Sequence, residues 1–168
     1  PRTRTDRMHI LLLNDDGIDA PGLVALRGAL ARFARVSVVA PRYEQSGVSH
    51  SITIFKPLAV HVRSSADRRV QAMVEGTPAD CVKLALGDLL KKRPDLVISG
   101  INLGTNAGIN VFYSGTVAGA MEAAFSGVPA MAISLATKHE PDFACAARVA
   151  VHLIRKVLPD HCTPGVVF

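Results

Sequence analysis

The sequence is poor in cysteine, and the few cysteines are spaced in a way that excludes two classes of protein. Its 168 residues include three cysteines, Cys81, Cys145 and Cys162, and no two of them form a CxxC pair. Neither a disulfide framework nor a zinc knuckle is therefore indicated, and a reduced, cytoplasmic setting is predicted. We expect Cys81 and Cys145, which lie in helical patterns, to be small core residues.

Aromatic residues and long apolar runs are also scarce. Phe, Trp and Tyr together make up 5% of the chain, and they do not interleave with its basic pairs. A nucleic-acid polymer is therefore not an expected partner, although the net charge of +5 would suit an anionic ligand. No apolar run approaches the ~20 residues of a membrane span, so no membrane partner is expected.

Several common catalytic motifs are missing. The absence of GxGxxG and P-loop spacings excludes the usual dinucleotide and nucleoside-triphosphate cradles. The six histidines form no HExxH pair, which disfavours a zinc hydrolase. There is no GxSxG elbow, so a hydrolase with a catalytic triad is disfavoured as well.

Apolar runs and helical repeats alternate along the chain and predict one α/β domain over residues 8–168. The run 9–13 is continuously apolar, as in a buried parallel strand, and a helix over 21–34 and a strand over 36–40 complete a βαβ unit. Short strands that form an antiparallel excursion are predicted next, followed by alternating helices and strands. This order predicts a three-layer αβα, Rossmann-like, mostly parallel sheet with a β-hairpin excursion. The predicted excursion comprises 52–55, 58–63 and 69–74, and the later elements are helices from 78, from 115 and over 143–157 and strands at 95–99, 129–135 and 165–168.

Asn14-Asp15-Asp16-Gly17 directly follows the first predicted strand. Two adjacent carboxylates raise each other's pKa, and a divalent cation relieves that repulsion. Ligands bind outside the carboxyl ends of strands in such sheets, which favours a metal site here. The same composition also favours a plain turn, and this stretch alone does not decide between the two interpretations.

Two further oxygen-bearing side chains follow other predicted strands. Ser46 lies in the polar loop 41–50 after the second strand, and Asn102 follows the strand at 95–99. With Asp15 and Asp16 they would supply two carboxylates, a hydroxyl and an amide carbonyl at one edge of the sheet. These are hard ligands, typical of Mg²⁺ or Mn²⁺ rather than zinc.

Two predicted helix starts carry polar residues with alternative interpretations. Ser114-Gly115-Thr116 could bind a phosphate at a helix N-terminus, although ordinary N-capping by Ser114 explains the same residues. Asp80 follows Thr77-Pro78 in a typical capping pattern, and we favour the capping role over a catalytic one.

At these residues the sequence resembles the SurE family, the survival-protein-E nucleotidases and phosphatases. The resemblance extends over about residues 8–168 and rests on many motifs in the same order. They are Asn14-Asp15-Asp16-Gly17, Ala20-Pro21-Gly22, Val39-Ala40-Pro41, Ser46-Gly47, Ser49-His50-Ser51, Gly76-Thr77-Pro78-Ala79-Asp80-Cys81, Ser99-Gly100-Ile101-Asn102, Gly104 with Asn106, and Tyr113-Ser114-Gly115-Thr116-Val117.

The resemblance implies a metal-dependent phosphomonoesterase that hydrolyses nucleoside 5′- and 3′-monophosphates. It implies that Asp15, Asp16, Ser46 and Asn102 bind the metal, while Asn106 and the segment 114–116 line a phosphate pocket. His50 is either a further pocket residue or a plain surface histidine. Asp15 or Asp16 would act as general base or nucleophile, and their spacing does not say which.

The resemblance also bears on the ends of the chain and on its assembly. Family members usually continue past this point with a tail that exchanges between subunits, so we expect that tail to be absent here and the full-length protein to be a homodimer or homotetramer. Residues 1–7 are expected to be a basic extension or a tag remnant. A signalling receiver domain is disfavoured because the corresponding strand ends in Ser99-Gly100-Ile101-Asn102, which provides no acceptor aspartate. A nucleotide-binding module without catalysis remains an alternative.

Overall fold

The computed structural model describes residues 8–64, 69–161 and 165–168, with residues 64 and 157–161 described as backbone only. The predictions made for residues 1–7 and for Cys162 lie outside these residues. No helix in the described part of the chain is long and apolar enough to cross a membrane.

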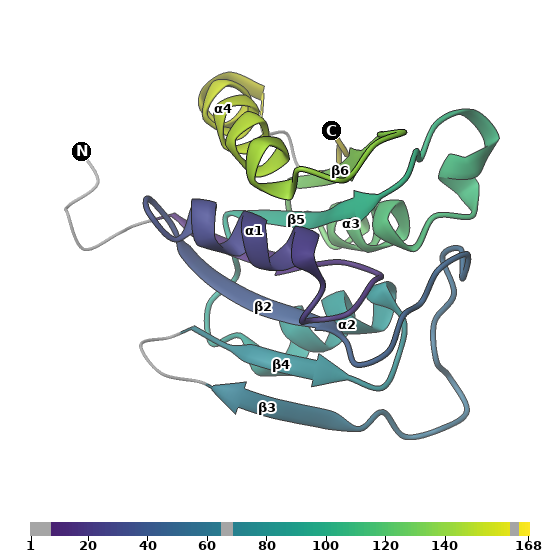
Figure 1. The fold of residues 1–168 in the computed structure, drawn as a ribbon. Coiled ribbons are helices and arrows are strands. Elements are labelled where there is room, and N and C mark those ends of the chain that lie inside the picture. Colours follow the sequence, from purple (N-terminus) through teal and green to yellow (C-terminus); the bar gives the residue numbers. More distant parts are fainter. Residues whose placement is uncertain (1–7, 65–68, 162–164) are drawn as a thin grey trace.

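The centre of the molecule is a six-stranded sheet with the strand order β3-β4-β2-β1-β5-β6 (Figure 1). All neighbouring strands are parallel except β3 and β4, which are antiparallel. This confirms the predicted mostly parallel sheet with a β-hairpin excursion at one edge. The strands are β1 (His9–Leu13), β2 (Arg35–Pro41), β3 (Val60–Ser64), β4 (Gln71–Val74), β5 (Leu96–Leu103) and β6 (Ala130–Leu135).

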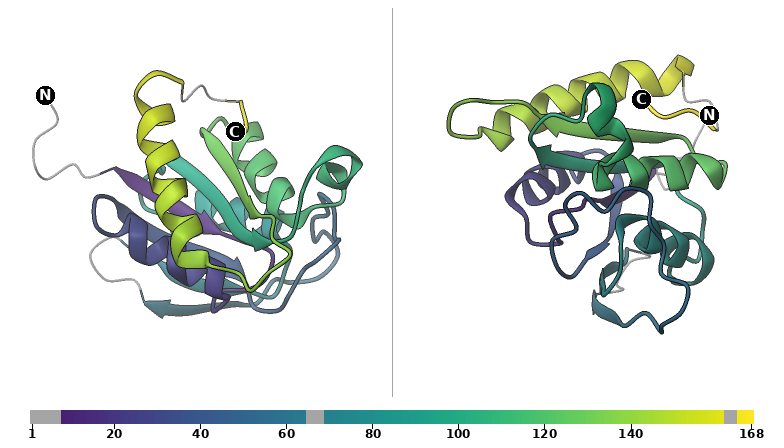
Figure 2. Two further views of the ribbon diagram at one scale, coloured as in Figure 1. Left: turned by 45° about the horizontal axis from the view of Figure 1, so that its top comes forward. Right: turned by 90° about the vertical axis from the view of Figure 1, so that its right-hand side faces the viewer.

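Helices cover both faces of the sheet and make the predicted three layers (Figures 1 and 2). The helices α1 (Pro21–Leu30) and α4 (Phe143–His161) pack against each other on one face. On the other face α2 (Pro78–Leu84), continued by the π-helical turn η2 (Ala85–Leu89), packs against α3 (Gly115–Phe125). A short 3-10 helix, η3 (Gly108–Phe112), precedes α3.

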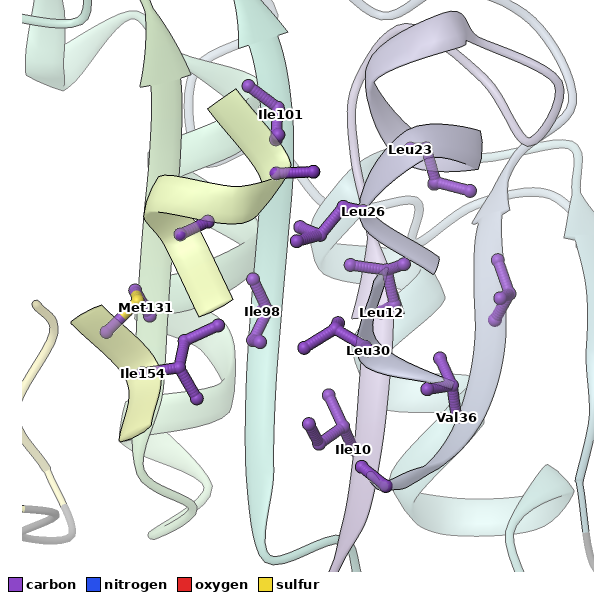
Figure 3. Close-up of a cluster of buried hydrophobic side chains, with 14 of the residues drawn as sticks. Ile10, Leu12, Leu23, Leu26, Leu30, Val36, Ile98, Ile101, Met131 and Ile154 are labelled. Carbon is purple, nitrogen blue, oxygen red and sulfur yellow. The ribbon is translucent and has the colours of Figure 1, made fainter. Parts of the chain in front are cut away.

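The core consists of two apolar clusters, one on each face of the sheet, and β1 contributes to both. Ile10 and Leu12 belong to the cluster under α1 and α4, which Figure 3 shows, whereas Leu11 and Leu13 belong to the cluster under α2 and α3. All four side chains are fully buried, which stabilises the fold by roughly 1.5–3 kcal/mol for each residue. A strand buried on both faces requires the continuous apolar run that the sequence shows.

One predicted strand is wrong, and another is present only as its first contacts. Residues 52–55 form no strand, and the apolar side chains of Ile52, Ile54 and Phe55 are exposed. This segment is held by side-chain bonds to α2, so its alternating pattern has no sheet to pair with. At the other end, residues 165–168 begin to pair in parallel with β6, through a bridge between Val167 and Ala130 and two backbone hydrogen bonds of Phe168, as expected of the start of a strand.

Two smaller predictions also need correction. The helix predicted over 21–34 ends at Leu30, and turns follow it up to β2. Cys81 is buried as predicted, but Cys145, in the first turn of α4, is exposed.

Candidate active site

The register of the sheet brings the ends of three strands to one edge. Leu12 pairs with Val38 of β2, and Leu13 pairs with Ser99 of β5. The acidic turn after β1 therefore emerges between the loop that follows β2 and the end of β5, on the right in Figure 1. This is the ligand-binding edge of a parallel sheet.

The stretch Asn14–Gly17 is a closed turn. The buried Asn14 side chain donates from Nδ2 to the Gly17 carbonyl at 2.9 Å and accepts from the Gly17 N–H at 3.2 Å. Gly17 has a φ of 106°, a conformation that favours glycine. A turn of this kind belongs to both interpretations, and it presents two successive carboxylates at the edge of the sheet.

Asp15 is packed against the start of α3. Asp15 is 5% exposed, and Thr116 Oγ1 donates a hydrogen bond to Asp15 Oδ1 at 2.5 Å. A Cβ atom on Gly115 would lie 2.8 Å from the Asp15 Cβ, so this close approach requires glycine. The backbone is held too, because the Gln45 N–H donates to the Asp15 carbonyl at 2.7 Å.

The acidic pair Asp15–Asp16 places two carboxylates in a largely buried position. Burial, followed by the charges of Asp15 and Glu44, raises the pKa of Asp16 to about 6. Burial also raises the pKa of Asp15, although the hydrogen bond from Thr116 opposes that shift. Among the described residues, no Lys, Arg or His forms an ion pair with either carboxylate. A bound cation would relieve this repulsion.

The predicted ligand set fits a hard divalent cation. The described residues contain no group of three His, Cys, Asp or Glu side chains that could hold a metal, so a cation here needs neutral oxygen ligands as well. Asn102 Nδ2 donates to the Gly104 carbonyl at 3.5 Å, which leaves its Oδ1 for a ligand. Ser46 Oγ donates to Glu44 Oε1 at 2.7 Å, which leaves the lone pairs of its hydroxyl for a ligand. Carboxylate, hydroxyl and amide oxygens suit Mg²⁺ or Mn²⁺.

The residues predicted to bind phosphate lie at the start of α3 and on the loop after β5. Ser114 is the N-cap, and its Oγ accepts from the Val117 N–H at 3.1 Å, so its capping role is confirmed. The first turn of any α-helix presents N–H groups that the helix itself cannot satisfy, at the positive end of its dipole. Asn106 lies on the loop after β5, and its Nδ2 donates to Ser134 Oγ of β6 at 2.8 Å.

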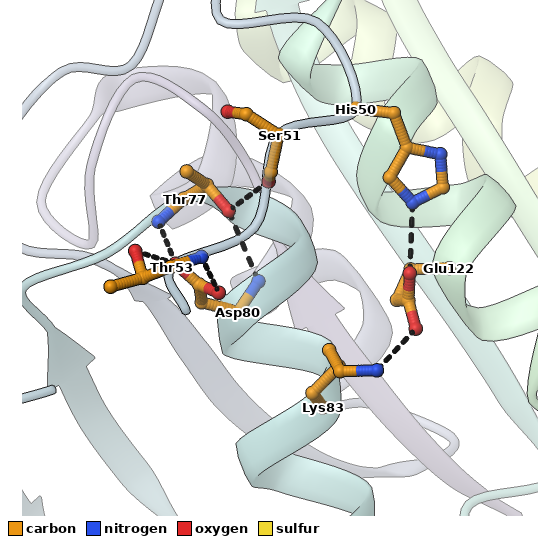
Figure 4. Close-up of polar contacts among 7 residues, drawn as sticks. All are labelled: His50, Ser51, Thr53, Thr77, Asp80, Lys83 and Glu122. Carbon is orange, nitrogen blue, oxygen red and sulfur yellow. Dashed lines mark hydrogen bonds and ion pairs between the residues drawn. The ribbon is translucent and has the colours of Figure 1, made fainter. Parts of the chain in front are cut away.

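The segment that follows Ser46 is tied to both helices of this face (Figure 4). His50 Nε2 lies 2.8 Å from Glu122 Oε2 of α3, and its ring stacks on Phe125 with the centroids 5.5 Å apart. Asp80 completes a capping box with Thr77 and accepts two bonds from Thr53, so its structural role is confirmed.

Comparisons with known proteins place the whole arrangement in a family. The family described as "Survival protein SurE" matches residues 10–167. The chain belongs to the SurE family. A SurE crystal structure from Aquifex aeolicus superposes with a TM-score of 0.83 at 44% identity, covering 90% of this chain and 60% of that one.

Two curated SurE relatives carry the name 5′-nucleotidase SurE. The protein of Desulfatibacillum aliphaticivorans is 48% identical over 95% of this chain and 63% of its own length. That of Desulforudis audaxviator is 54% identical over 90% of this chain and 58% of its own length. The chain thus spans about three-fifths of the length of the SurE relatives it matches.

Two residues of this candidate site were not predicted from the sequence. Gln45 fastens the loop after β2 to Asp15, and the charge of Glu44 raises the pKa of both acidic residues. Both are neighbours of Ser46 in a loop that the sequence places on the ligand side. Their roles depend on how the loop folds back over β1, and residue types alone do not reveal that.

Proposed function

We propose that this chain forms the catalytic domain of a divalent-metal-dependent phosphomonoesterase that hydrolyses nucleoside 5′- and 3′-monophosphates. The observation that carries the proposal is the acidic pair Asp15–Asp16, whose Asp15 packs against the N-terminus of α3 and which has no counter-charge from the described residues. One half of this arrangement suits a cation and the other half suits a phosphate. The name 5′-nucleotidase borne by the SurE relatives supports the same activity.

In this proposal Asp15, Asp16, Ser46 and Asn102 hold Mg²⁺ or Mn²⁺. Such a cation, when bound, neutralises phosphate oxygens and lowers the pKa of a coordinated water. Its ligands come from three separate strand ends, so the folded sheet sets their spacing.

The contacts of the two carboxylates suggest different duties. Asp15 is held at its side chain by Thr116 and at its carbonyl by Gln45, which suits a rigid anchoring ligand. Among the described residues, no side chain donates a hydrogen bond to the Asp16 carboxylate, which therefore lacks the anchoring contact that Asp15 has. We therefore assign to Asp16 the general base that accepts a proton from the attacking water.

The phosphate is proposed to lie at the start of α3, with Asn106 beside it. The N–H groups of the first turn and the helix dipole would stabilise the negative charge that moves onto the phosphoryl oxygens. The Ser114 hydroxyl accepts from Val117, so its own proton is available to a phosphate oxygen. Gly115 allows the close backbone approach, and Thr116 contributes through its bond to Asp15.

The direct test is phosphate release from a panel of nucleoside 5′- and 3′-monophosphates with Mg²⁺ or Mn²⁺, with and without EDTA. We expect release that EDTA abolishes, and the panel would rank the substrates and metals. The variant Asp88→Asn, which neutralises an exposed acid outside the site, serves as the matched control. Nucleotide binding without release would instead indicate a binding module and contradict the proposal.

Assembly and location complete the proposal. We expect the full-length protein to be a homodimer or homotetramer that acts in the cytoplasm. Sedimentation equilibrium of the full-length protein would test the assembly, and a monomer over the micromolar range would contradict it.

A further inference from the structure

Glu44 is an exposed residue whose carboxylate is hydrogen-bonded to Ser46, a proposed metal ligand. Its Oε1 accepts a hydrogen bond from Ser46 Oγ, with 2.7 Å between the two oxygen atoms. The two residues lie in the loop that Gln45, between them, fastens to the Asp15 carbonyl. The position of this pair relative to the acidic turn is therefore set by the backbone of the loop.

A serine can bind a cation as a neutral ligand only if its hydroxyl proton points elsewhere. The proton and the lone pairs share one oxygen, so an acceptor for the proton decides which way the lone pairs face. Partners of this kind, one step away from the metal, orient ligands and influence affinity. Glu44 is in the position to act as such an acceptor for Ser46.

We propose that Glu44 is a positioning residue that orients the Ser46 hydroxyl toward the divalent cation. The inference rests on the proposed function, because it requires a cation bound by Ser46. Glu44 also adds negative charge near the same site, since its charge contributes to the raised pKa of both Asp15 and Asp16. Orientation of the hydroxyl and long-range attraction of the cation are separable effects, and the experiment below distinguishes them.

The test measures Mn²⁺ binding to the protein by isothermal titration calorimetry, without any substrate. Glu44→Ala removes both the acceptor and the charge, and we expect it to weaken Mn²⁺ binding by about 10–100-fold. Glu44→Gln keeps an oxygen that can accept the hydroxyl proton and loses only the charge, so we expect it to recover a clear part of that loss. The control Glu140→Gln removes an exposed charge on the loop before α4 and should leave the affinity within about twofold.

A double-mutant cycle with Ser46→Ala isolates the bond itself. If Glu44 acts through the hydroxyl, Glu44→Ala should have little further effect on Mn²⁺ affinity once Ser46 is alanine. An equal loss in both backgrounds, or equal losses for Glu44→Gln and Glu44→Ala, would show an effect of charge alone and overturn the inference.

Two outcomes separate a failure of the inference from a failure of the proposed function. Wild-type binding with an unchanged Glu44→Ala variant would overturn the role of Glu44 and leave the proposed function intact. No Mn²⁺ binding by the wild type would overturn the proposed metal site and the role of Glu44 with it. Thermal unfolding without metal should be similar for all single variants, because Glu44 and Ser46 are both exposed.

Discussion

The N-termini of α2 and α3 both hold a buried aspartate, and the two are used differently. Asp80, 2% exposed, belongs to its own helix and accepts hydrogen bonds from the Thr77 N–H and from the N–H and hydroxyl of Thr53. Asp15 lies in the turn after β1, its carboxylate accepts a hydrogen bond from Thr116, and Asp16 follows it in the chain. The Asp80 carboxylate is fully hydrogen-bonded to neighbouring residues, whereas the Asp15 carboxylate lies next to a second negative charge, that of Asp16. The contrast separates a structural acid from one positioned for a ligand.

The largest expected effect is a loss of activity when Asp15 or Asp16, near the N-terminus of α3, is substituted. Asp15→Asn and Asp16→Asn should each lower phosphate release by about 10²–10⁴-fold, because each removes a proposed ligand charge and Asp16 is the proposed base. Steady-state kinetics with Mn²⁺ and circular dichroism measure activity and folding together. Turnover close to wild type in folded Asp15→Asn and Asp16→Asn would contradict the assigned site.

At the N-terminus of α2, substitution of Asp80 should lower the stability of the fold. Asp80→Asn replaces an acceptor by an amide that cannot match all the donors around it, so unfolding should become easier by about 3 kcal/mol. Urea denaturation measures this change, and Asp88→Asn is again the control. A stable Asp80→Asn variant with greatly reduced turnover would instead support the catalytic role that we set aside for Asp80.

The pH dependence of stability should also reveal the difference. The pKa of Asp16 is raised from 3.8 to about 6 by burial and by Asp15 and Glu44, so the folded state favours its protonated form. The resulting stabilisation is complete below pH 3.8 and is lost as the pH rises through about 6. For the metal-free protein we expect a loss of about 1–3 kcal/mol between pH 5 and 8.

Thermal unfolding at several pH values, in EDTA, measures this loss. Asp16→Asn should flatten the dependence, and Mn²⁺ should raise the unfolding temperature most at neutral pH. If the stability of the metal-free wild type and that of Asp16→Asn change equally between pH 5 and 8, the Asp16 carboxylate is not destabilised by its surroundings, and the expectation is contradicted.

The smallest expected effect concerns His50, for which the sequence left two interpretations open. Its bond to Glu122 and its stacking on Phe125 favour a role in holding the loop, so His50→Gln should cost about 0.5–1 kcal/mol of stability. KM for a nucleoside monophosphate should stay within about twofold of wild type. A KM raised tenfold or more without loss of stability would place His50 in the phosphate pocket.

Much of the fold follows from local pattern. The continuous apolar run of β1 and the capping residues of α2 are local signals, so these elements appear where expected. Residues 52–55 mislead because alternation indicates a strand only if a neighbouring strand can pair with it. The segment is instead fastened to Asp80 by Thr53.

The sequence by itself determined strand β1, which is buried on both faces, the acidic turn that follows it and the helix α3 capped by Ser114. Each of these depends on residues close together in the chain. Only the tertiary structure decided that Thr116 donates a hydrogen bond to Asp15, that Gln45 fastens the neighbouring loop, and that Glu44 accepts a hydrogen bond from the Ser46 hydroxyl. Except for the Glu44–Ser46 bond, these contacts join residues far apart in sequence. The proposed role of that short-range bond also depends on the tertiary structure, because the register of β1 between β2 and β5 sets which loops meet at one edge of the sheet.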